Sequence, residues 1–177
     1  ISDGKGILAA DESNGTMTKR LEAVGLPSTP ENRLLFRESI MSSQSMKECI
    51  GGVILYDETI NQTTSFGKLI PDLISSSGAL PGIKVDTGAK DLANSSGEKI
   101  TEGLDGLRER LQKYYKLGAR FTKWRGVYGI SEKYPSKLAI HTNAHALARY
   151  SALVQESRMV PIVEPEVLMD GVHSADS

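Results

Sequence analysis

Short apolar segments alternate with longer amphipathic segments along the whole chain, and this alternation restricts the fold more than any other feature. The short segments have the length and β-branched content of strands, whereas the longer ones repeat apolar residues at helical spacing. Strands joined by helical crossovers run parallel to one another. We therefore predict an α/β protein with strands at Gly6–Asp11, Ile50–Asp57, Gly82–Asp86, Ala119–Val127 and Met159–Leu168.

Sequence signals at segment ends predict where the helices begin and stop. Asn14 is expected to cap the first helix, and Thr29 followed by Pro30 is expected to open the second. Pro71 is expected to interrupt the third, and Gly118 stands where a glycine commonly ends a helix. The predicted helices are Gly15–Val24, Glu31–Met41, Gly67–Ser76, Gly103–Leu117 and Ser136–Glu156.

The last two helical segments each show one apolar face at 3–4 residue spacing. In Gly103–Leu117 this face comprises Leu104, Leu107, Leu111 and Tyr114. In Ser136–Glu156 the predicted face comprises Ile140, Ala144, Leu147, Ser151 and Val154.

Two parallel architectures fit this pattern, an open doubly wound sheet and a (β/α)8 barrel. A barrel needs on the order of 250 residues, whereas this chain has 177 and supplies five strand–helix steps. Length alone favours the open sheet, unless the chain belongs to something larger. At roughly 150 residues per domain, a single domain is expected.

Composition excludes several functional classes. The formal net charge of −1 argues against a nucleic-acid or anionic-membrane surface as the main function. No apolar run approaches the roughly 20 residues that a membrane-spanning helix requires. The single cysteine, Cys49, can form neither an internal disulfide nor a cysteine-rich metal site. The chain opens without a signal peptide and without Met, so we expect a processed, trimmed or incomplete N-terminus.

Ionisable residues lie toward the C-terminal ends of four predicted strands, where catalytic groups of parallel α/β folds collect. Period-two alternation places those of each strand on one face. A single such residue is most simply explained as facing solvent, but four strands with the same pattern predict an acid/base site for an anionic substrate. The set comprises Asp11, Lys84, Asp86, Lys123, Arg125, Glu164 and Glu166.

Three residues after the first strand could extend this site. Ser13, Gly15 and Thr16 stand where a helix begins, and hydroxyls with free backbone amides at that position suit a phosphate. By themselves they are more simply explained as an ordinary helix cap.

Two further patterns carry weaker hypotheses. The stretch Arg108–Arg125 mixes basic and aromatic residues, as nucleic-acid surfaces do, but it divides into a helix and a strand that point its charges in different directions. His141 and His145 have the i,i+4 spacing of a metal site without an identifiable third ligand, and a solvated helix flank explains them more simply.

Six motifs along the chain resemble class I fructose-1,6-bisphosphate aldolase, in the correct order and over the whole sequence. They are Gly4–Ser13, Gly51–Leu55, Gly82–Asp86, Gly103–Leu107, Phe121–Arg125 and Val160–Glu166. The resemblance implies a (β/α)8 TIM barrel, of which residues 1–177 would be a single partial domain truncated at both ends, with about the first five strand–helix units. It also implies reversible cleavage of fructose 1,6-bisphosphate to dihydroxyacetone phosphate and glyceraldehyde 3-phosphate through a lysine Schiff base, with no metal or other cofactor.

The resemblance assigns catalytic roles to four residues. Asp11 would handle the hydroxyl proton during carbon–carbon bond cleavage, and Lys123 would stabilise developing negative charge. Glu164 would act as general acid/base in forming and hydrolysing the Schiff base, and Glu166 would support the nucleophilic lysine electrostatically.

It assigns substrate binding to six more. Lys84 would bind phosphate and hydroxyl groups, and Arg125 would hold the neighbouring acids and contribute to the anion site. The residues expected to contact substrate phosphates are Ser13, Thr16, Arg20 and Arg33.

One family residue has no counterpart here. The Schiff-base lysine lies on the sixth strand of the family's barrel, and this chain stops at Ser177, after the fifth. The full-length protein is therefore expected to be a lyase, and the 177-residue chain alone is expected to be inactive and poorly stable.

The resemblance further implies a cytoplasmic homotetramer with a phosphorylated sugar substrate and neither nucleic-acid nor membrane partners. A plastid location would apply if a transit peptide preceded Ile1. Two alternatives remain open, a non-catalytic scaffold or binding protein on an aldolase-like half barrel and a metal-dependent phosphosugar aldolase.

Overall fold

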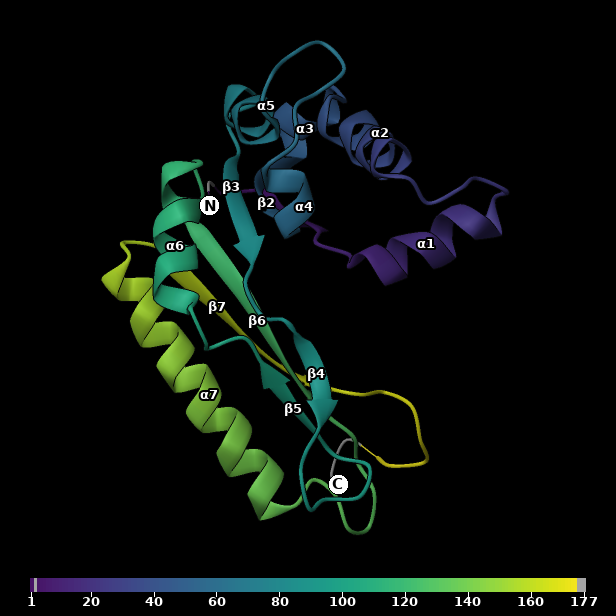
Figure 1. The fold of residues 1–177 in the computed structure, drawn as a ribbon, viewed down its shortest axis with the longest axis vertical. Helices are drawn as coiled ribbons and strands as arrows, with labels where there is room; N and C mark the ends of the chain where they lie inside the picture. The colour runs from purple at the N-terminus through teal and green to yellow at the C-terminus, as the bar shows by residue number, and fades with distance from the viewer. Residues whose placement is uncertain (2, 175–177) are drawn as a thin grey trace. The chain divides into compact units, whose positions relative to one another are not determined.

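The computed structural model of the protein describes residues 1 and 3–174. Its strands are β1 (Gly6–Ala10), β2 (Ile50–Leu55), β3 (Leu80–Lys84), β4 (Gly88–Asp91), β5 (Lys99–Glu102), β6 (Phe121–Tyr128) and β7 (Val160–Val167). Its helices are α1 (Asn14–Ala23), α2 (Pro30–Met41), α3 (Ser45–Cys49), α4 (Asp57–Ile60), α5 (Ile70–Ser76), α6 (Leu107–Lys116) and α7 (Lys137–Glu156). Figure 1 shows these elements in chain order.

The strand order separates the two predicted architectures. Five strands are hydrogen-bonded in the order β1-β2-β3-β6-β7, and β1–β2 and β2–β3 pair in parallel. Each strand therefore lies beside the next strand of the sheet along the chain, as in a (β/α)8 barrel. A doubly wound sheet would reverse direction at a switch point. The open sheet that chain length favoured is therefore wrong. Length indicates how many strand–helix units are present, but it does not indicate the order of the strands in the sheet.

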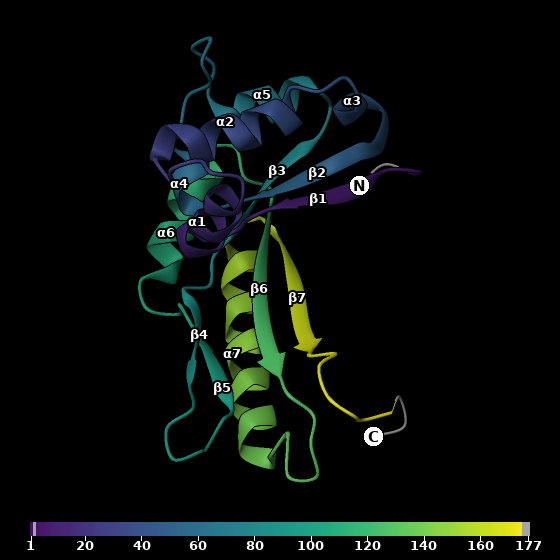
Figure 2. The same cartoon turned by 90° about the vertical axis from the view of Figure 1, so that its right-hand side faces the viewer.

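The chain divides into two compact units. The first unit comprises residues Ile1–Lys84 and Gln112–Thr122, and the second comprises Val85–Leu111 and Lys123–Ser177. In the first, β1, β2 and β3 lie side by side, and α2 packs against α1 and α5 (Figure 2). In the second, α7 packs along β7 and β5.

Helix boundaries follow local chemistry with three corrections. Ser13, not Asn14, caps α1, because its Oγ accepts a hydrogen bond from the backbone amide of Thr16 at 3.3 Å. Pro71 does not interrupt α5 but lies in its first turn, where a missing amide hydrogen costs nothing. The fourth predicted helix starts at Leu107 rather than Gly103, whose φ of 130° is incompatible with a helix. Thr29 caps α2 as expected.

The apolar face of α7 is rotated from the predicted one. Its buried residues are Ala139, Asn143, Ala146, Leu147, Tyr150 and Val154, whereas Ile140 and Ala144 are exposed. The reason is Trp124 of β6, which is fully buried and places its ring centroid 5.3 Å from that of Tyr150. This aromatic contact determines which face of the helix turns toward the sheet.

Phe121 fills the space over two glycines within the first unit. A Cβ atom at Gly82 of β3 would overlap the Phe121 ring, and one at Gly52 of β2 would lie 3.0 Å from it. Phe121 is 5% exposed, and its ring packs directly on the two glycine backbones. Neither glycine has a positive φ, so close approach rather than backbone conformation explains them.

Four elements escaped the sequence analysis. β4 and β5 form an antiparallel hairpin in which Gly88 pairs with Glu102 and Asp91 with Lys99. The helices α3 and α4 are only five and four residues long. In the described part of the chain, no helix is long and apolar enough to cross a membrane.

Candidate active site

Two ion pairs join β6 to β7 within the second unit. The Nζ atom of Lys123 lies 3.2 Å from Oε2 of Glu164, and the guanidinium of Arg125 pairs with the carboxylate of Glu166. Both pairs use alternate residues of neighbouring strands, so all four side chains lie on one face. The Lys123 side chain is 13% exposed and that of Glu164 is 37% exposed. The arrangement brings two cations and two carboxylates into one partly open surface, as acid/base chemistry on an anion requires.

Asp86 accepts hydrogen bonds from two backbone amides. Its Oδ1 accepts from the amide of Gly88 at 3.0 Å, and its Oδ2 accepts from the amide of Arg125 at 3.3 Å. Asp86 is 9% exposed. Asp86 therefore connects the start of the β4–β5 hairpin to β6, beside the Arg125–Glu166 pair.

The first unit carries the other predicted site residues. Asp11 follows β1 directly and is 9% exposed, and Lys84 ends β3 and is partly buried. Ser13 and Thr16 follow at the start of α1, with their hydroxyl oxygens 3.2 Å apart. The Ser13 hydroxyl is thus the helix cap, and the Thr16 side chain beside it is exposed.

The two predicted arginines of this unit differ in their surroundings. Arg20 is half exposed and pairs with Glu12, which follows Asp11. Arg33 is largely buried and forms a bidentate pair with Glu58, with nitrogen–oxygen distances of 2.8 and 2.5 Å. The hydrogen bonds to Arg33 lower the pKa of Glu58, and the same hydrogen bonds raise the pKa of Arg33. A third nitrogen of Arg33 donates to the backbone oxygen of Ser28 at 2.7 Å.

Sequence reasoning missed Arg37 of α2. It is fully buried and contacts Glu12 and Thr59. Arg33 and Arg37 have i,i+4 spacing, which places them on one face of α2. That spacing was readable from the sequence, but nothing in it showed that the face turns inward.

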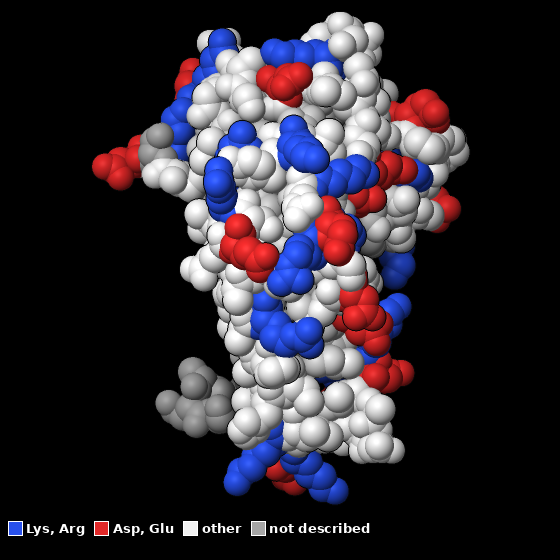
Figure 3. Space-filling view, turned by 60° about the vertical axis from the view of Figure 1, so that its left-hand side comes forward, with Lys and Arg blue, Asp and Glu red and all other residues white. Residues whose placement is uncertain are grey.

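The basic stretch of residues 108–125 is engaged within the chain. Arg108 forms a bidentate pair with Glu156, and Arg110 donates to the backbone oxygen of Val85 at 2.8 Å. Arg120 lies over the ring of Tyr115, 4.5 Å from its centroid. On the face drawn in Figure 3, basic and acidic side chains are interspersed. These three arginines are therefore engaged within the chain.

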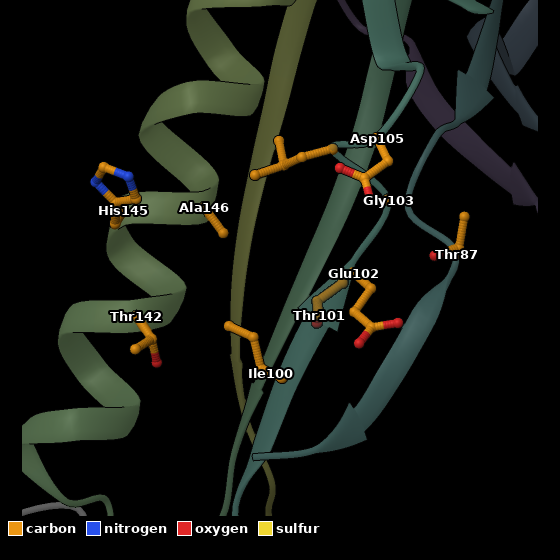
Figure 4. A pocket seen from close by; sticks show the side chains of 10 residues that line it. Thr87, Ile100, Thr101, Glu102, Gly103, Asp105, Thr142, His145 and Ala146 are labelled. Atoms are coloured by element: carbon orange, nitrogen blue, oxygen red, sulfur yellow. The ribbon is translucent and has the colours of Figure 1, made fainter. Parts of the chain in front are cut away.

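The second unit contains a pocket of about 460 Å³ whose lining includes none of the ion-paired residues. Figure 4 shows Thr142, His145 and Ala146 on α7 across from the segment of Ile100 to Asp105. None of its lining residues belongs to the predicted site. The charge pattern at the strand ends, rather than this pocket, therefore identifies the candidate site.

Comparison with known proteins assigns a family. The family model "Fructose-bisphosphate aldolase class-I" matches residues 1–177. A probable fructose-bisphosphate aldolase class 1 of Xylella fastidiosa is 53% identical over 173 residues, covering 98% of this chain and 52% of the relative. The cytosolic fructose-bisphosphate aldolase 6 of Arabidopsis thaliana is 52% identical over 170 residues, covering 96% of this chain and 48% of the relative.

A solved structure agrees with these relatives. It contains fructose-bisphosphate aldolase from Plasmodium falciparum in complex with TRAP and a small-molecule inhibitor. The match has a TM-score of 0.96 at 45% identity and covers 99% of this chain and 51% of that one. The chain thus spans about half the length of the relatives it matches. Its fold is part of a (β/α)8 barrel, and the chain belongs to the class I fructose-bisphosphate aldolase family.

Proposed function

We propose that the protein containing this chain cleaves fructose 1,6-bisphosphate reversibly to dihydroxyacetone phosphate and glyceraldehyde 3-phosphate through a lysine Schiff base. The observation that carries the proposal is the presence of the Lys123–Glu164 and Arg125–Glu166 pairs on neighbouring strands of a chain from the aldolase family. These four residues lie within the motifs on which the family resemblance rests.

The reaction begins with a lysine amine adding to the ketone of the sugar and losing water. We assign to Glu164 the proton transfers of this addition and dehydration, because a carboxyl group beside an ammonium can accept and return protons. Lys123, 3.2 Å from Glu164, stabilises the negative charge that develops on oxygen. Glu166, paired with Arg125, supports the nucleophilic lysine electrostatically.

Cleavage of the bond between C3 and C4 then needs a base at the C4 hydroxyl, on the second carbon beyond the Schiff-base carbon C2. We assign this to Asp11, whose carboxylate takes the hydroxyl proton. The carbon–carbon bond breaks, the new carbonyl leaves as an aldehyde, and the bonding electrons pass to the iminium nitrogen. Such proton transfer contributes a factor of about 10²–10⁴ to rate.

Binding of the two phosphates requires cations and hydrogen-bond donors. Ser13 and Thr16 at the start of α1 supply hydroxyls beside a helix N-terminus, which favours anions. The cationic groups that we assign to substrate binding are Lys84, Arg125 and Arg20. The family resemblance adds Arg33, whose guanidinium nitrogens donate to Glu58 and Ser28 in this structure.

The nucleophilic lysine is proposed to lie outside this chain. The family has it on the sixth strand of the barrel, and no lysine here matches that motif. We propose that residues 1–177 form one partial barrel domain and that this polypeptide alone is inactive. The whole protein is further proposed to be a cytoplasmic homotetramer, which a solution mass from light scattering would test.

Borohydride trapping with dihydroxyacetone phosphate tests the proposal. The protein encoded by the complete gene should gain a covalent adduct on intact-mass analysis, and it should keep its activity with a chelator present. The 177-residue polypeptide should gain none. If the gene-encoded protein neither forms the adduct nor cleaves the sugar, the lyase proposal fails and a non-catalytic scaffold replaces it. Loss of cleavage with the chelator would support the metal-dependent alternative instead.

A further inference from the structure

A buried arginine holds the segment that carries Asp11. Arg37 of α2 is fully buried, and its Nη2 donates to the backbone oxygen of Glu12 at 2.6 Å. Its Nη1 donates to Oγ1 of Thr59, a buried residue of α4, at 2.7 Å. The guanidinium thereby ties the residue between Asp11 and Ser13 to two helices. All of these groups belong to the first unit.

Glu12 also connects this buried arginine to the surface. The carboxylate of Glu12 pairs with the half-exposed Arg20, while its Oε2 lies 3.8 Å from Nη2 of Arg37. Glu12 therefore connects a proposed phosphate-binding arginine to the buried one. A displacement of this segment would move Asp11 and the Ser13 cap together.

Burial of this polar network is unfavourable for the stability of the fold. Among the described residues, Nε of Arg37 and Oε2 of Glu12 are buried without a hydrogen-bond partner. Burial lowers the pKa of Arg37, whereas the negative charges of Glu12, Glu58 and Asp11 oppose that shift. A well-packed apolar side chain is often at least as stabilising as a buried ionic group. Retaining a guanidinium here therefore fits a role in placing the neighbouring polar groups.

We propose that Arg37 is a positioning residue for the cleavage step, fixing the Asp11–Ser13 segment through the carbonyl of Glu12 and through Thr59. The inference rests on the proposed function, because that function gives Asp11 the hydroxyl proton. It places Arg37 outside contact with the reacting atoms. Schiff-base formation, assigned to Glu164, should then depend on Arg37 much less than cleavage does.

The test compares two reactions of the gene-encoded protein. Arg37→Lys keeps the positive charge but cannot reach both Glu12 and Thr59 as the forked guanidinium does. We expect kcat for cleavage to fall roughly ten- to hundredfold, since small displacements of a reacting group have effects of this size. KM for the bisphosphate should rise no more than a few-fold, as expected for a displaced Ser13. The rate of adduct formation with saturating dihydroxyacetone phosphate and borohydride should stay within about twofold.

Thr59 provides a second and gentler variant. Thr59→Val removes the acceptor of Nη1 while Arg37 stays, so cleavage should fall a few-fold. Thr59→Ser, which retains the hydroxyl, should restore it. This pair decides the question if Arg37→Lys does not fold. Arg108→Lys, at an exposed pair with Glu156, is the matched control and should leave both reactions unchanged.

Three results have different meanings. If cleavage and trapping fall in parallel in Arg37→Lys and Thr59→Val, Arg37 only supports the fold and the inference is overturned. If neither reaction changes, it is overturned as well. If the unsubstituted protein forms no adduct with dihydroxyacetone phosphate, the proposed function itself has failed.

Discussion

The Arg33–Glu58 pair of the first unit and the Arg125–Glu166 pair of the second differ in how exposed their side chains are. In the first unit, the guanidinium of Arg33 is 9% exposed and its partner Glu58 is 21% exposed, and each of its nitrogens has a protein partner. In the second unit, the side chains of Arg125 and Glu166 are 42% and 38% exposed. Buried pairs are expensive to separate, whereas exposed pairs exchange partners readily. We therefore expect the Arg125–Glu166 pair to exchange partners more readily than the Arg33–Glu58 pair, which we call the frame-holding pair because its burial ties α2 to α4.

The largest effect is expected at the strand-end pairs. Glu164→Gln removes the proposed acid/base while keeping the side-chain shape, so kcat for cleavage should fall roughly hundred- to thousandfold. Steady-state kinetics of the gene-encoded protein measure it. Glu156→Gln, at the exposed pair with Arg108, is the control and should retain activity. Activity of Glu164→Gln within about twofold of the parent would remove the assigned role.

Substitution in the frame-holding pair, Arg33–Glu58, should lower the free energy of unfolding. Glu58→Gln leaves the buried Arg33 without its carboxylate, and breaking such a pair costs about 3 kcal/mol of unfolding free energy. Urea unfolding followed by fluorescence measures the loss, again with Glu156→Gln as the reference. An unchanged midpoint for Glu58→Gln would mean that this pair does not hold the frame.

Acid should weaken the same pair. Hydrogen bonds from Arg33 lower the pKa of Glu58 below its usual value of 4.5. A carboxyl group with a lowered folded-state pKa stabilises the protein above its unfolded-state pKa, and this contribution disappears as the pH falls through the folded-state value. The stability difference between the parent and Glu58→Gln should therefore be full at neutral pH and shrink below pH 4.5. A difference that stays constant on acidification would contradict this assignment.

The smallest effect separates the two helix caps. Ser13 caps α1 and Ser136 caps α7, each by accepting a hydrogen bond from the backbone amide three residues on. Ser13→Ala and Ser136→Ala should each cost about 1 kcal/mol of stability. Only Ser13→Ala should also raise KM for the bisphosphate a few-fold, because only that helix start is assigned to phosphate. Equal KM values for the two variants would reduce Ser13 to a cap.

The strands were predictable because buried parallel strands leave a clear apolar signal. Each predicted strand overlaps an observed one, with shifts of a few residues at the ends. The β4–β5 hairpin gives no such signal, because residues such as Lys90, Asp91 and Lys99 are exposed on it. The helix starts at Ile70 and Leu107 depend on the backbone conformations of Pro71 and Gly103. Residue type alone does not specify these conformations.

The candidate site was predictable only in part, for a related reason. Alternation along β6 and β7 places Lys123, Arg125, Glu164 and Glu166 on shared faces, but which cation meets which carboxylate depends on strand register. Arg37 carried no comparable signal. An arginine on an amphipathic helix is usually solvated, and its burial follows from how α2 packs against α1 and α5.

The packing of Phe121 on Gly52 and Gly82 has a consequence for sequence change. A side chain added at Gly82 occupies the volume of the Phe121 ring, so the effects of the two substitutions cannot be additive. A smaller residue at Phe121 must come first, because the reverse order passes through an overlapping intermediate. These positions are therefore epistatic, and we expect most side chains at Gly82 to destabilise the fold as long as Phe121 is unchanged.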